Sequence, residues 1–367
     1  MRIAVNTRLL IKDSLEGIGR FTLETLRRLV LNHPEVEFVF CFDRKFDPDF
    51  IFSPNVKGVV VYPQARHPLL YYIWFQYSLP KVLEREKIDL LLSPDGFIPL
   101  NGKVKTLSVI HDIAFEHANN GVDWLHQLYY KHYFPKFAKQ ATRVVTVSEF
   151  SKADLVKTYQ LAPGKVDVIY NGVSAVFKPT EKSLKDKTPY FIYVGAIHPR
   201  KNVVGLLKAF EAFKIAHPEF SHQLLLVGRK SWQLSTIVRY LKTMRFRRDV
   251  LFNKNVSDDD LNLLLNNATA LIYPSFFEGF GLPVIEAFSC GIPVVTSKGT
   301  AMEEISQGAA HLFDPENINE LAEKIYEQAS GKVSNQEKIN LGLKCAQQYN
   351  WDDTAAHIWQ SILKTIN

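Results

Sequence analysis

Two glutamates stand eight positions apart in a stretch that is unsuited to one continuous helix. Glu278 and Glu286 lie within FFEGFGLPVIEAFSCG, residues 276–291, which contains three glycines and a proline. In an unbroken helix the two side chains would be roughly 80° apart on one face, an ordinary surface pair. The glycines and the proline instead predict a loop followed by a helix, with one glutamate in each.

The neighbouring elements place both glutamates at one edge of a sheet. ALIYPS predicts a buried strand that ends near Ser275, and FFEGFG predicts the loop that follows it. PVIEAFSC predicts a helix that has Pro283 in its first turn and is closed by Gly291. Glu278 then follows the carboxyl end of a strand, and Glu286 lies in the first turn of the helix. Ligands of open α/β sheets bind at this edge.

The start of this helix predicts a site for an anion. The backbone amides of Phe280, Gly281 and Leu282 have no acceptor within the helix, and the glycines allow a phosphate to come close. Two carboxylates beside a phosphate would repel it unless they bind neutral hydroxyl groups, which are good donors to carboxylates. A sugar and a ribose carry such hydroxyls, so Glu278 and Glu286 suit a nucleotide sugar.

Short apolar runs alternate with segments of helical length along the chain. The runs are RIAVN, FVFCF, VVVY, DLLLS, LSVIHD, RVVTVS and VDVIY, then YFIYVG, QLLLVG, VLFN, ALIYPS and PVVTS. This alternation predicts the α/β class, with parallel sheets covered by helices on both faces. The polar, lysine-rich stretch at residues 174–189 has the composition of a linker between domains at 1–173 and 190–350. We expect two doubly wound domains with a cleft between them.

The composition is that of a globular protein. The chain has 367 residues, 46% hydrophobic and 22% charged, and a net charge of +6 that suits phosphate-bearing ligands or an anionic membrane without identifying either. Three widely spaced cysteines, Cys41, Cys290 and Cys345, form no CxxC pair and favour a reducing compartment. The N-terminus lacks a signal-peptide pattern, and we expect a cytoplasmic protein without a membrane span.

Several motifs together resemble one enzyme family. PSFFEGFGLPVIEAFSCGIPVVTS is similar to the E-x7-E signature of glycosyltransferase family 4, whose GT-B enzymes transfer sugars from nucleotide donors with retention of configuration. GIGRF, the HD pair, TVSEFSKADL, VIYNGV, YVGAIHPRKN and the terminal WDDTAAHIW extend the resemblance over nearly the whole chain. The resemblance implies that the helix near 351–367 packs back on the first domain. It also implies a donor held by the second domain and an acceptor held by the first.

The resemblance also implies roles for the residues of the second domain. Glu286 would bind the donor ribose, and Glu278 the hydroxyls of the donor sugar, with help from the amides of residues 280–282. Arg200 and Lys201 follow a predicted strand, and two cations there would stabilise the diphosphate as it leaves. The notable departure is Ala196, because many members carry an arginine directly after the glycine of that strand. Arg200 would then stand in for it.

In the first domain, the resemblance points to a histidine and a glycine loop. His111 ends the predicted strand LSVIHD and would lie near the donor sugar or the reaction centre. Gly17 and Gly19, with Arg20, form a loop that would approach the donor phosphate or the acceptor. The same glycines with Asp43 imitate a dinucleotide-binding fingerprint, but the third glycine is missing and the loop is too long for it.

An acidic run that could be mistaken for a metal site has a simpler explanation. Asp258, Asp259 and Asp260 follow Ser257, which predicts a helix N-cap with acids in the first turn. The sequence therefore calls for no metal and no cofactor beyond the donor. Two aromatic, basic stretches at 66–87 and 124–143 suit either a core or a membrane surface, and nothing indicates a nucleic-acid site.

These observations favour a retaining glycosyltransferase that moves a hexose to a glycan or lipid-linked glycan during cell-surface polysaccharide synthesis. The motifs HPRKN and EGFGLPVIEAFSCG look most like those of mannosyltransferase-type members, so GDP-mannose is the first candidate donor, with a UDP-sugar as the other. The protein would be cytoplasmic, with a peripheral contact at the inner face of a membrane. The alternatives are a nucleotide-sugar epimerase, another GT-B enzyme such as a phosphorylase, and a non-catalytic protein that binds sugar nucleotides.

Overall fold

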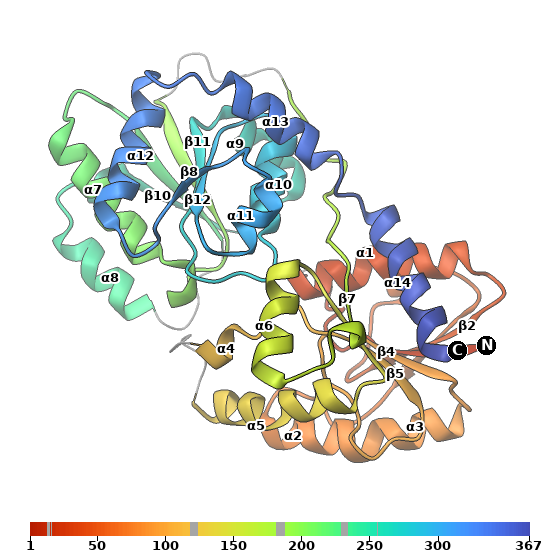
Figure 1. The fold of residues 1–367 in the computed structure, drawn as a ribbon. Coiled ribbons are helices and arrows are strands. Elements are labelled where there is room, and N and C mark those ends of the chain that lie inside the picture. Colours follow the sequence, from red (N-terminus) through yellow and green to blue (C-terminus); the bar gives the residue numbers. More distant parts are fainter. Residues whose placement is uncertain (13–14, 16, 118–123, 181–187, 229–233, 255) are drawn as a thin grey trace. The chain divides into compact units, whose positions relative to one another are not determined.

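Two compact units make up the chain (Figure 1). The computed structural model describes residues 1–367 except 13–14, 16, 118–123, 181–187, 229–233 and 255. Met1–Gly172 and Asn350–Asn367 form the first unit, and Val173–Tyr349 form the second. Each unit is built on one parallel sheet. The predicted α/β class is therefore confirmed.

The first unit contains a seven-stranded sheet of order β3-β2-β1-β4-β5-β6-β7. Its strands are β1 (Arg2–Asn6), β2 (Glu37–Phe42), β3 (Val56–Val60), β4 (Leu90–Ser93), β5 (Lys105–Val109), β6 (Arg143–Thr146) and β7 (Val166–Val168). The strand order reverses between β1 and β4, and loops at the carboxyl ends of these strands meet at that point. In doubly wound folds this is where ligands bind.

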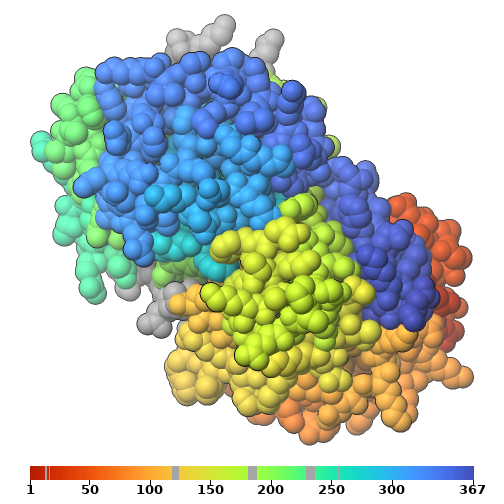
Figure 2. Space-filling model, in the orientation of Figure 1, coloured from red at the N-terminus to blue at the C-terminus, as the bar shows by residue number. Residues whose placement is uncertain are grey.

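Helices cover both faces of this sheet. They are α1 (Gly17–Asn32), α2 (Pro68–Ile73), α3 (Leu79–Arg85), α4 (Ala114–His117), α5 (Trp124–Gln140), α6 (Glu149–Tyr159) and α14 (Trp351–Ile366), with a π-helical turn at Trp74–Ser78 and 3-10 turns at Pro48–Phe50 and Pro163–Lys165. An aromatic core lies under α2, α3 and α5. The C-terminal α14 packs against α1, where Arg28 Nε donates to Asp352, and Figure 2 shows the blue C-terminal residues against the red N-terminal ones.

The second unit contains a six-stranded sheet of order β10-β9-β8-β11-β12-β13. Its strands are β8 (Tyr190–Val194), β9 (Gln223–Val227), β10 (Val250–Asn253), β11 (Ala270–Tyr273), β12 (Val294–Ser297) and β13 (His311–Phe313). Each of the twelve apolar runs overlaps one of the strands, and within the described part of the chain β13 is the strand that the sequence did not predict. The order reverses between β8 and β11.

The helices of the second unit again lie on two sides of the sheet (Figure 1). They are α7 (Val203–Ala216), α8 (Leu234–Thr243), α9 (Asp258–Asn267), α10 (Leu282–Ser289), α11 (Ala301–Ser306), α12 (Ile318–Ser330) and α13 (Gln336–Ala346), with 3-10 turns at Pro199–Lys201 and Arg247–Asp249. α12 packs on α7, and α13 packs on α10. Among the described residues, no helix is long and apolar enough to cross a membrane.

The predicted linker is held by the second unit where it is described. The backbone amide of Lys178 donates to Asn262 Oδ1 at 3.1 Å, and that of Thr180 donates to Asn266 Oδ1 at 2.8 Å. Residues 181–187 lie outside the described part of the chain. Residues 174–180 therefore belong to the second unit rather than to a separate connector.

Candidate active site

Glu278 lies in the loop that follows β11, at the reversal of strand order in the second unit. β8 is the neighbouring strand, and the loop after β8 carries Arg200 and Lys201 in a 3-10 turn. The two loops are joined directly, because the amide of Phe276 donates to the carbonyl of Arg200 at 2.9 Å. Residues separated by almost eighty positions in the sequence thus meet at one edge of the sheet.

The side chains of these two loops form a buried cluster of charges. Lys201 Nζ is 2.5 Å from Glu278 Oε1, and Arg200 Nη1 is 3.1 Å from Glu278 Oε2. Arg200 Nη1 also donates to the carbonyl of Phe277 at 2.6 Å. The Glu278 side chain is only 8% exposed, and those of Lys201 and Arg200 are 14% and 21% exposed. The structure brings together three residues that the sequence analysis selected from two separate motifs.

The cations keep the central carboxylate charged. Burial alone would raise the pKa of Glu278, but the charges of Arg200 and Lys201 outweigh it and lower this pKa from 4.5 to about 2. His198 caps the same 3-10 turn with Nδ1, and burial and the two cations lower its pKa from 6.5. The cluster therefore holds a carboxylate and two cations together at neutral pH, with a net positive charge.

Two tyrosines that the sequence analysis missed lie beneath this cluster. Lys201 Nζ donates to the hydroxyl of Tyr273 at 2.7 Å, and that hydroxyl donates to Glu278 Oε1 at 3.2 Å. Tyr193 stacks on Tyr273 with ring centroids 6.1 Å apart and donates to the carbonyl of Ala196 at 3.0 Å. Each ends or nearly ends a strand of apolar residues, so from the sequence they look like ordinary core aromatics. A hydroxyl at the carboxyl end of a buried strand was the signal that could have found Tyr273.

Two glycines let the loop after β8 approach the loop after β9. Gly195 and Gly228 have φ values of +145° and +153°. A Cβ on Gly228 would lie 2.0 Å from the carbonyl oxygen of Gly195, a distance too short for two non-bonded atoms. Any residue other than glycine at position 228 would therefore push the two loops apart. The glycine of the motif YVGAIHPRKN therefore gives the loop its path from β8 to the 3-10 turn that carries the two cations.

The second glutamate is placed slightly differently from the prediction. Gly281, with φ +101°, precedes α10, which begins at Leu282. Glu286 is therefore the fifth residue of α10, in its second turn and not in its first as predicted, and it is buried. Phe280 is also buried and packs on Tyr349 with ring centroids 5.6 Å apart. Glu286 and the amides at the start of α10 lie on the element that directly follows the loop of Glu278.

The predicted residues of the first unit occupy the carboxyl edge of its sheet. His111 lies two residues beyond the end of β5 and is not part of that strand as predicted. Its Nε2 donates to the carbonyl of Pro94 at 2.9 Å, its ring packs on Phe21 with centroids 4.9 Å apart, and burial lowers its pKa. Gly17 and Gly19 are not in a loop as predicted, because α1 already begins at Gly17.

The two glycines of α1 differ in their surroundings. A Cβ on Gly17 would meet nothing within 4 Å, whereas one on Gly19 would lie 2.9 Å from the carbonyl oxygen of Leu9. Gly19 therefore allows the helix to pack closely on the preceding segment, and Gly17 leaves the helix start open. Because His111 and these glycines belong to the other unit, their part in a reaction at Glu278 stays a prediction.

An ion pair in the first unit was also missed. Arg8 Nε is 2.6 Å from Asp95 Oδ2 at the reversal between β1 and β4, and both side chains are buried. Asn6 Nδ2 donates to Asp95 Oδ1 at 2.8 Å, and the Arg8 guanidinium lies 4.6 Å from the ring centroid of Phe97. Burial opposes the charge of Arg8, but Asp95 raises the pKa of Arg8 above its ordinary value. This pair stabilises the loop at 93–97, whose Pro94 carbonyl accepts from His111.

The acidic run at 258–260 and the Asp43 of the dinucleotide alternative have structural roles. Ser257 Oγ accepts from the amide of Asp260 at 3.1 Å at the start of α9, which confirms the predicted N-cap. No group of three metal-ligating side chains occurs among the described residues. Asp43, the acid of the dinucleotide alternative, is buried and bound by Arg44 and by the amide of Ala65.

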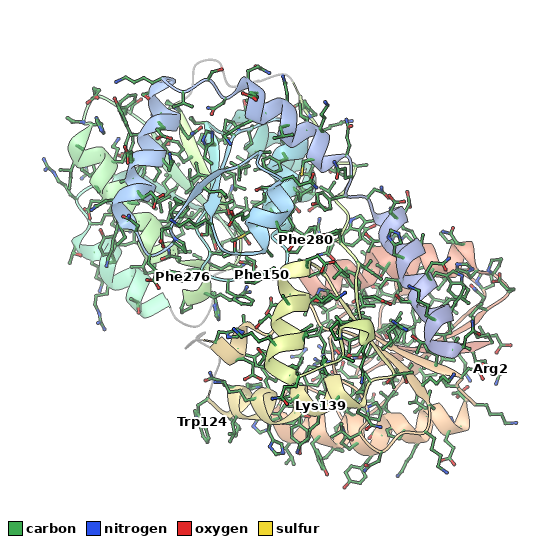
Figure 3. All side chains as sticks on the ribbon, viewed as in Figure 1. Arg2, Trp124, Lys139, Phe150, Phe276 and Phe280 are labelled. Atoms are coloured by element: carbon green, nitrogen blue, oxygen red, sulfur yellow. The ribbon has the colours of Figure 1, made fainter. Side chains whose placement is uncertain are left out.

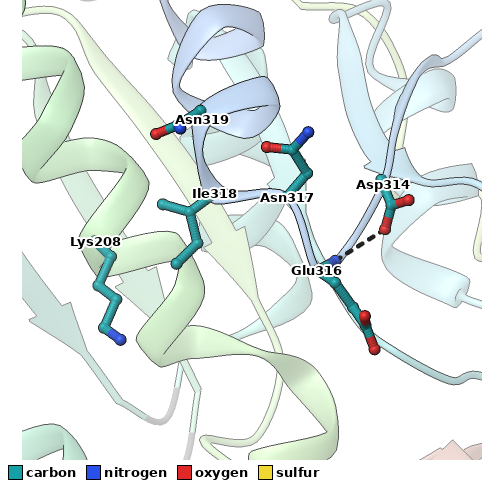
Figure 4. A pocket seen from close by; sticks show the side chains of 6 residues that line it. All are labelled: Lys208, Asp314, Glu316, Asn317, Ile318 and Asn319. Carbon is teal, nitrogen blue, oxygen red and sulfur yellow. Dashed lines mark hydrogen bonds between the residues drawn. The ribbon is translucent and has the colours of Figure 1, made fainter.

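One surface hollow of about 570 Å³ lies elsewhere in the second unit (Figure 4). Its lining residues are Lys208, Asp314, Glu316, Asn317, Ile318 and Asn319. They come from α7, from the segment between β13 and α12, and from the first two residues of α12, and the figure shows the amide of Glu316 bonded to Asp314. None of the predicted site residues lines this hollow.

Comparisons with known proteins agree with this arrangement. The family described as Glycosyltransferase Family 4 matches residues 15–176, and that described as Glycosyl transferases group 1 matches residues 177–339. The chain is similar to "O-antigen chain mannosyltransferase B" of Escherichia coli, with 25% identity over 94% of each chain.

Solved structures share the fold over the full length. The sucrose-phosphate synthase of Thermosynechococcus elongatus has a TM-score of 0.80 at 19% identity, covering 99% of this chain and 98% of the other. Anabaena HepE in complex with UDP-glucose has a TM-score of 0.74 at 16% identity, covering 99% of this chain and 100% of the other. The two family matches and the two Rossmann-like sheets lead to one conclusion: this chain belongs to glycosyltransferase family 4 and is a glycosyltransferase of the GT-B fold.

Proposed function

We propose that this glycosyltransferase transfers a hexose, with retention of configuration, from a nucleoside diphosphate sugar to a glycan or lipid-linked glycan of a cell-surface polysaccharide. The observation that carries the proposal is the convergence of Arg200 and Lys201 on Glu278 at the carboxyl edge of the second sheet. Two cations held in a buried site suit a diphosphate, because electrostatic stabilisation is strongest where water is excluded.

The chemistry follows from where negative charge develops. The bond between the anomeric carbon and the diphosphate oxygen breaks, and its electron pair stays on the diphosphate. The acceptor oxygen bonds to the anomeric carbon on the same face, and its proton passes to the leaving phosphate oxygen. Arg200 and Lys201 stabilise the growing charge and are the catalytic residues of the proposal. No metal and no further cofactor take part.

The remaining predicted residues bind the donor. A carboxylate accepts up to about four hydrogen bonds, so Glu278 can accept a sugar hydroxyl in addition to the bonds from Arg200, Lys201 and Tyr273. In the proposal Glu286 binds the ribose, and the amides at Gly281 and Leu282 bind the diphosphate at the start of α10. His111 and the start of α1 at Gly17 and Gly19 contribute from the first unit, which binds the acceptor.

The sugar is proposed from the relatives. The Escherichia coli protein is named a mannosyltransferase of the O-antigen chain, which supports mannose and a polysaccharide acceptor. The Anabaena structure holds UDP-glucose, so a uridine donor is the competing choice. GDP-mannose remains the first candidate and a UDP-sugar the second.

We also propose a peripheral contact with an anionic membrane. Most aromatic residues of the two aromatic, basic stretches, including Trp74 and Phe137, are buried in the core of the first unit. Trp124, which Figure 3 labels, and Leu128 are 72% and 61% exposed on α5. Lys131 follows on the same face of the helix, so apolar and basic side chains lie together as a lipid headgroup region requires.

The test is the release of nucleoside diphosphate from GDP-mannose, UDP-glucose and UDP-galactose in the presence of a lipid-linked glycan extract. We expect one donor to be consumed with sugar incorporated into the acceptor, and we expect Lys201→Met to reduce the rate by at least about 100-fold. Product without an acceptor, as an epimer of the donor, would identify an epimerase. Tight donor binding without release would identify a non-catalytic binding protein.

A further inference from the structure

We propose that Tyr273 is a positioning residue for the transfer, whose hydroxyl fixes the ammonium of Lys201 and the carboxylate of Glu278 relative to each other. This inference rests on the proposed function and adds a residue that the sequence motifs did not single out. Tyr273 would contact neither the sugar nor the diphosphate. It would act through Lys201.

The three groups form a closed triangle of hydrogen bonds. Lys201 Nζ donates to the hydroxyl of Tyr273 at 2.7 Å and lies 2.5 Å from Glu278 Oε1. The hydroxyl of Tyr273 donates to the same Oε1 at 3.2 Å. The ammonium of a lysine stands at the end of a flexible four-carbon chain. A single ion pair therefore lets the ammonium change its position around the carboxylate. The second contact, from a rigid ring, restricts that motion.

The ring itself is held from several sides. Tyr273 is the last residue of β11 and is 1% exposed. Thr296 Oγ1, from the adjacent β12, donates to its backbone carbonyl at 2.9 Å, and Tyr193 stacks on its ring. The Nζ atom of Lys201 also lies 5.1 Å from the centroid of the ring. The hydroxyl is thus presented from a fixed strand end rather than from a mobile loop.

The hydroxyl stays protonated at working pH. Burial and the negative charge of Glu278 raise the pKa of Tyr273 well above its ordinary value of 10. Tyr273 can therefore donate to the carboxylate and accept from the ammonium without adding or removing charge. The net positive charge that attracts the diphosphate is preserved while the lysine is held in place.

The proposal predicts a loss of rate more than a loss of donor binding. Negative charge on the leaving diphosphate is greatest in the transition state, so the position of Lys201 matters most there. Tyr273→Phe keeps the ring and removes the hydroxyl. We expect kcat to fall about 10- to 100-fold, as for the loss of one hydrogen bond to a charged group, with the donor KM changed less than about threefold.

The experiment is a double-mutant cycle with a matched control. Rates of nucleoside diphosphate release are measured for the wild type, Tyr273→Phe, Lys201→Met and the double variant, using whichever donor the wild type consumes. Tyr190→Phe is the control, because it removes a buried tyrosine hydroxyl at the opposite end of β8, where the acceptor is the neutral carbonyl of Leu264. We expect its kcat to stay within about threefold of the wild type.

The outcomes separate this inference from the proposed function. In the Lys201→Met background, adding Tyr273→Phe should cost less than about threefold, because the tyrosine acts through the lysine. Equal losses in both backgrounds, or a wild-type rate for Tyr273→Phe, would overturn the positioning role while leaving the proposed function intact. A wild type that releases no nucleoside diphosphate, or a fully active Lys201→Met, would overturn the proposed function and this inference with it.

Discussion

Replacing Glu278 by glutamine removes the negative charge that lies between two buried cations. Glutamine has nearly the shape of a protonated glutamic acid, so the variant imitates wild-type protein with Glu278 protonated. The pKa of Glu278 falls from an ordinary 4.5 to about 2 in the folded protein. At about 1.4 kcal/mol for each pKa unit, this corresponds to about 3 kcal/mol of stability at pH 7. Removal of one partner from a buried ion pair typically costs a similar amount.

The sign of the pH dependence follows from the same values. A carboxyl group whose pKa is lowered by folding contributes its full stability above pH 4.5 and loses it as the pH falls toward 2. The difference between the wild type and Glu278→Gln should therefore be about 3 kcal/mol at pH 7 and about half of that at pH 3. Below pH 2 the two proteins should be equally stable.

Scanning calorimetry measures this difference. For a unit of this size, about 3 kcal/mol corresponds to a decrease of roughly 6–12 °C in Tm at pH 7. Glu316→Gln is the matched control, because Glu316 is an exposed glutamate of the same unit, and its Tm should change by less than about 2 °C. An unchanged Tm for Glu278→Gln, or a decrease that is the same at pH 7 and pH 3, would refute the assignment of Glu278 as the partner of both cations.

Three further predictions concern other parts of the molecule. Gly172→Ala should lower Tm by several degrees, because its Cβ would lie 2.2 Å from the backbone nitrogen of Trp351. Gly164→Ala is the control and should leave Tm unchanged, because a Cβ there meets nothing within 4 Å. Equal Tm values for the two variants would contradict this packing. Trp124→Ser with Leu128→Ser should weaken flotation with liposomes that contain anionic lipid, and flotation that ignores either the substitutions or the lipid charge would refute the membrane contact. Transfer should continue at an unchanged rate in EDTA, and a loss that manganese restores would show that a metal is needed.

The sequence predicted the strands well because each is a short apolar run between turn signals. The exception is β13, His311–Phe313, which is only three residues long and contains a histidine. Element boundaries were less accurate. The glycine-rich GIGRF was predicted as a loop, but Gly17 already opens α1, and α10 begins one residue earlier than predicted, which makes Glu286 its fifth residue rather than its fourth. In both cases the error concerns the residue at which a helix begins, which local propensity determines only weakly.

The position of a site residue within its own loop or helix could be predicted from the sequence. The contacts between residues of different loops could not. Glu278 was placed correctly because the glycines and Pro283 define the loop and helix around it. The contact of Glu278 with Arg200 and Lys201 depends on the adjacency of β8 and β11, which strand order fixes and which no local pattern reveals. Tyr273 was missed for a related reason: its place at the carboxyl end of a buried strand was the one local signal, and its contact with Lys201 again depends on the adjacency of β8 and β11.

The donor site is tested by calorimetric titration, without added metal, with GDP, UDP, ADP, GDP-mannose, UDP-glucose and NAD. We expect one nucleoside diphosphate and its sugar to bind, and we expect Glu286→Ala to weaken that binding by at least about tenfold because the ribose loses its carboxylate partner. Binding of NAD alone, or of no ligand in this panel, would contradict a donor site built around Glu278 and Glu286.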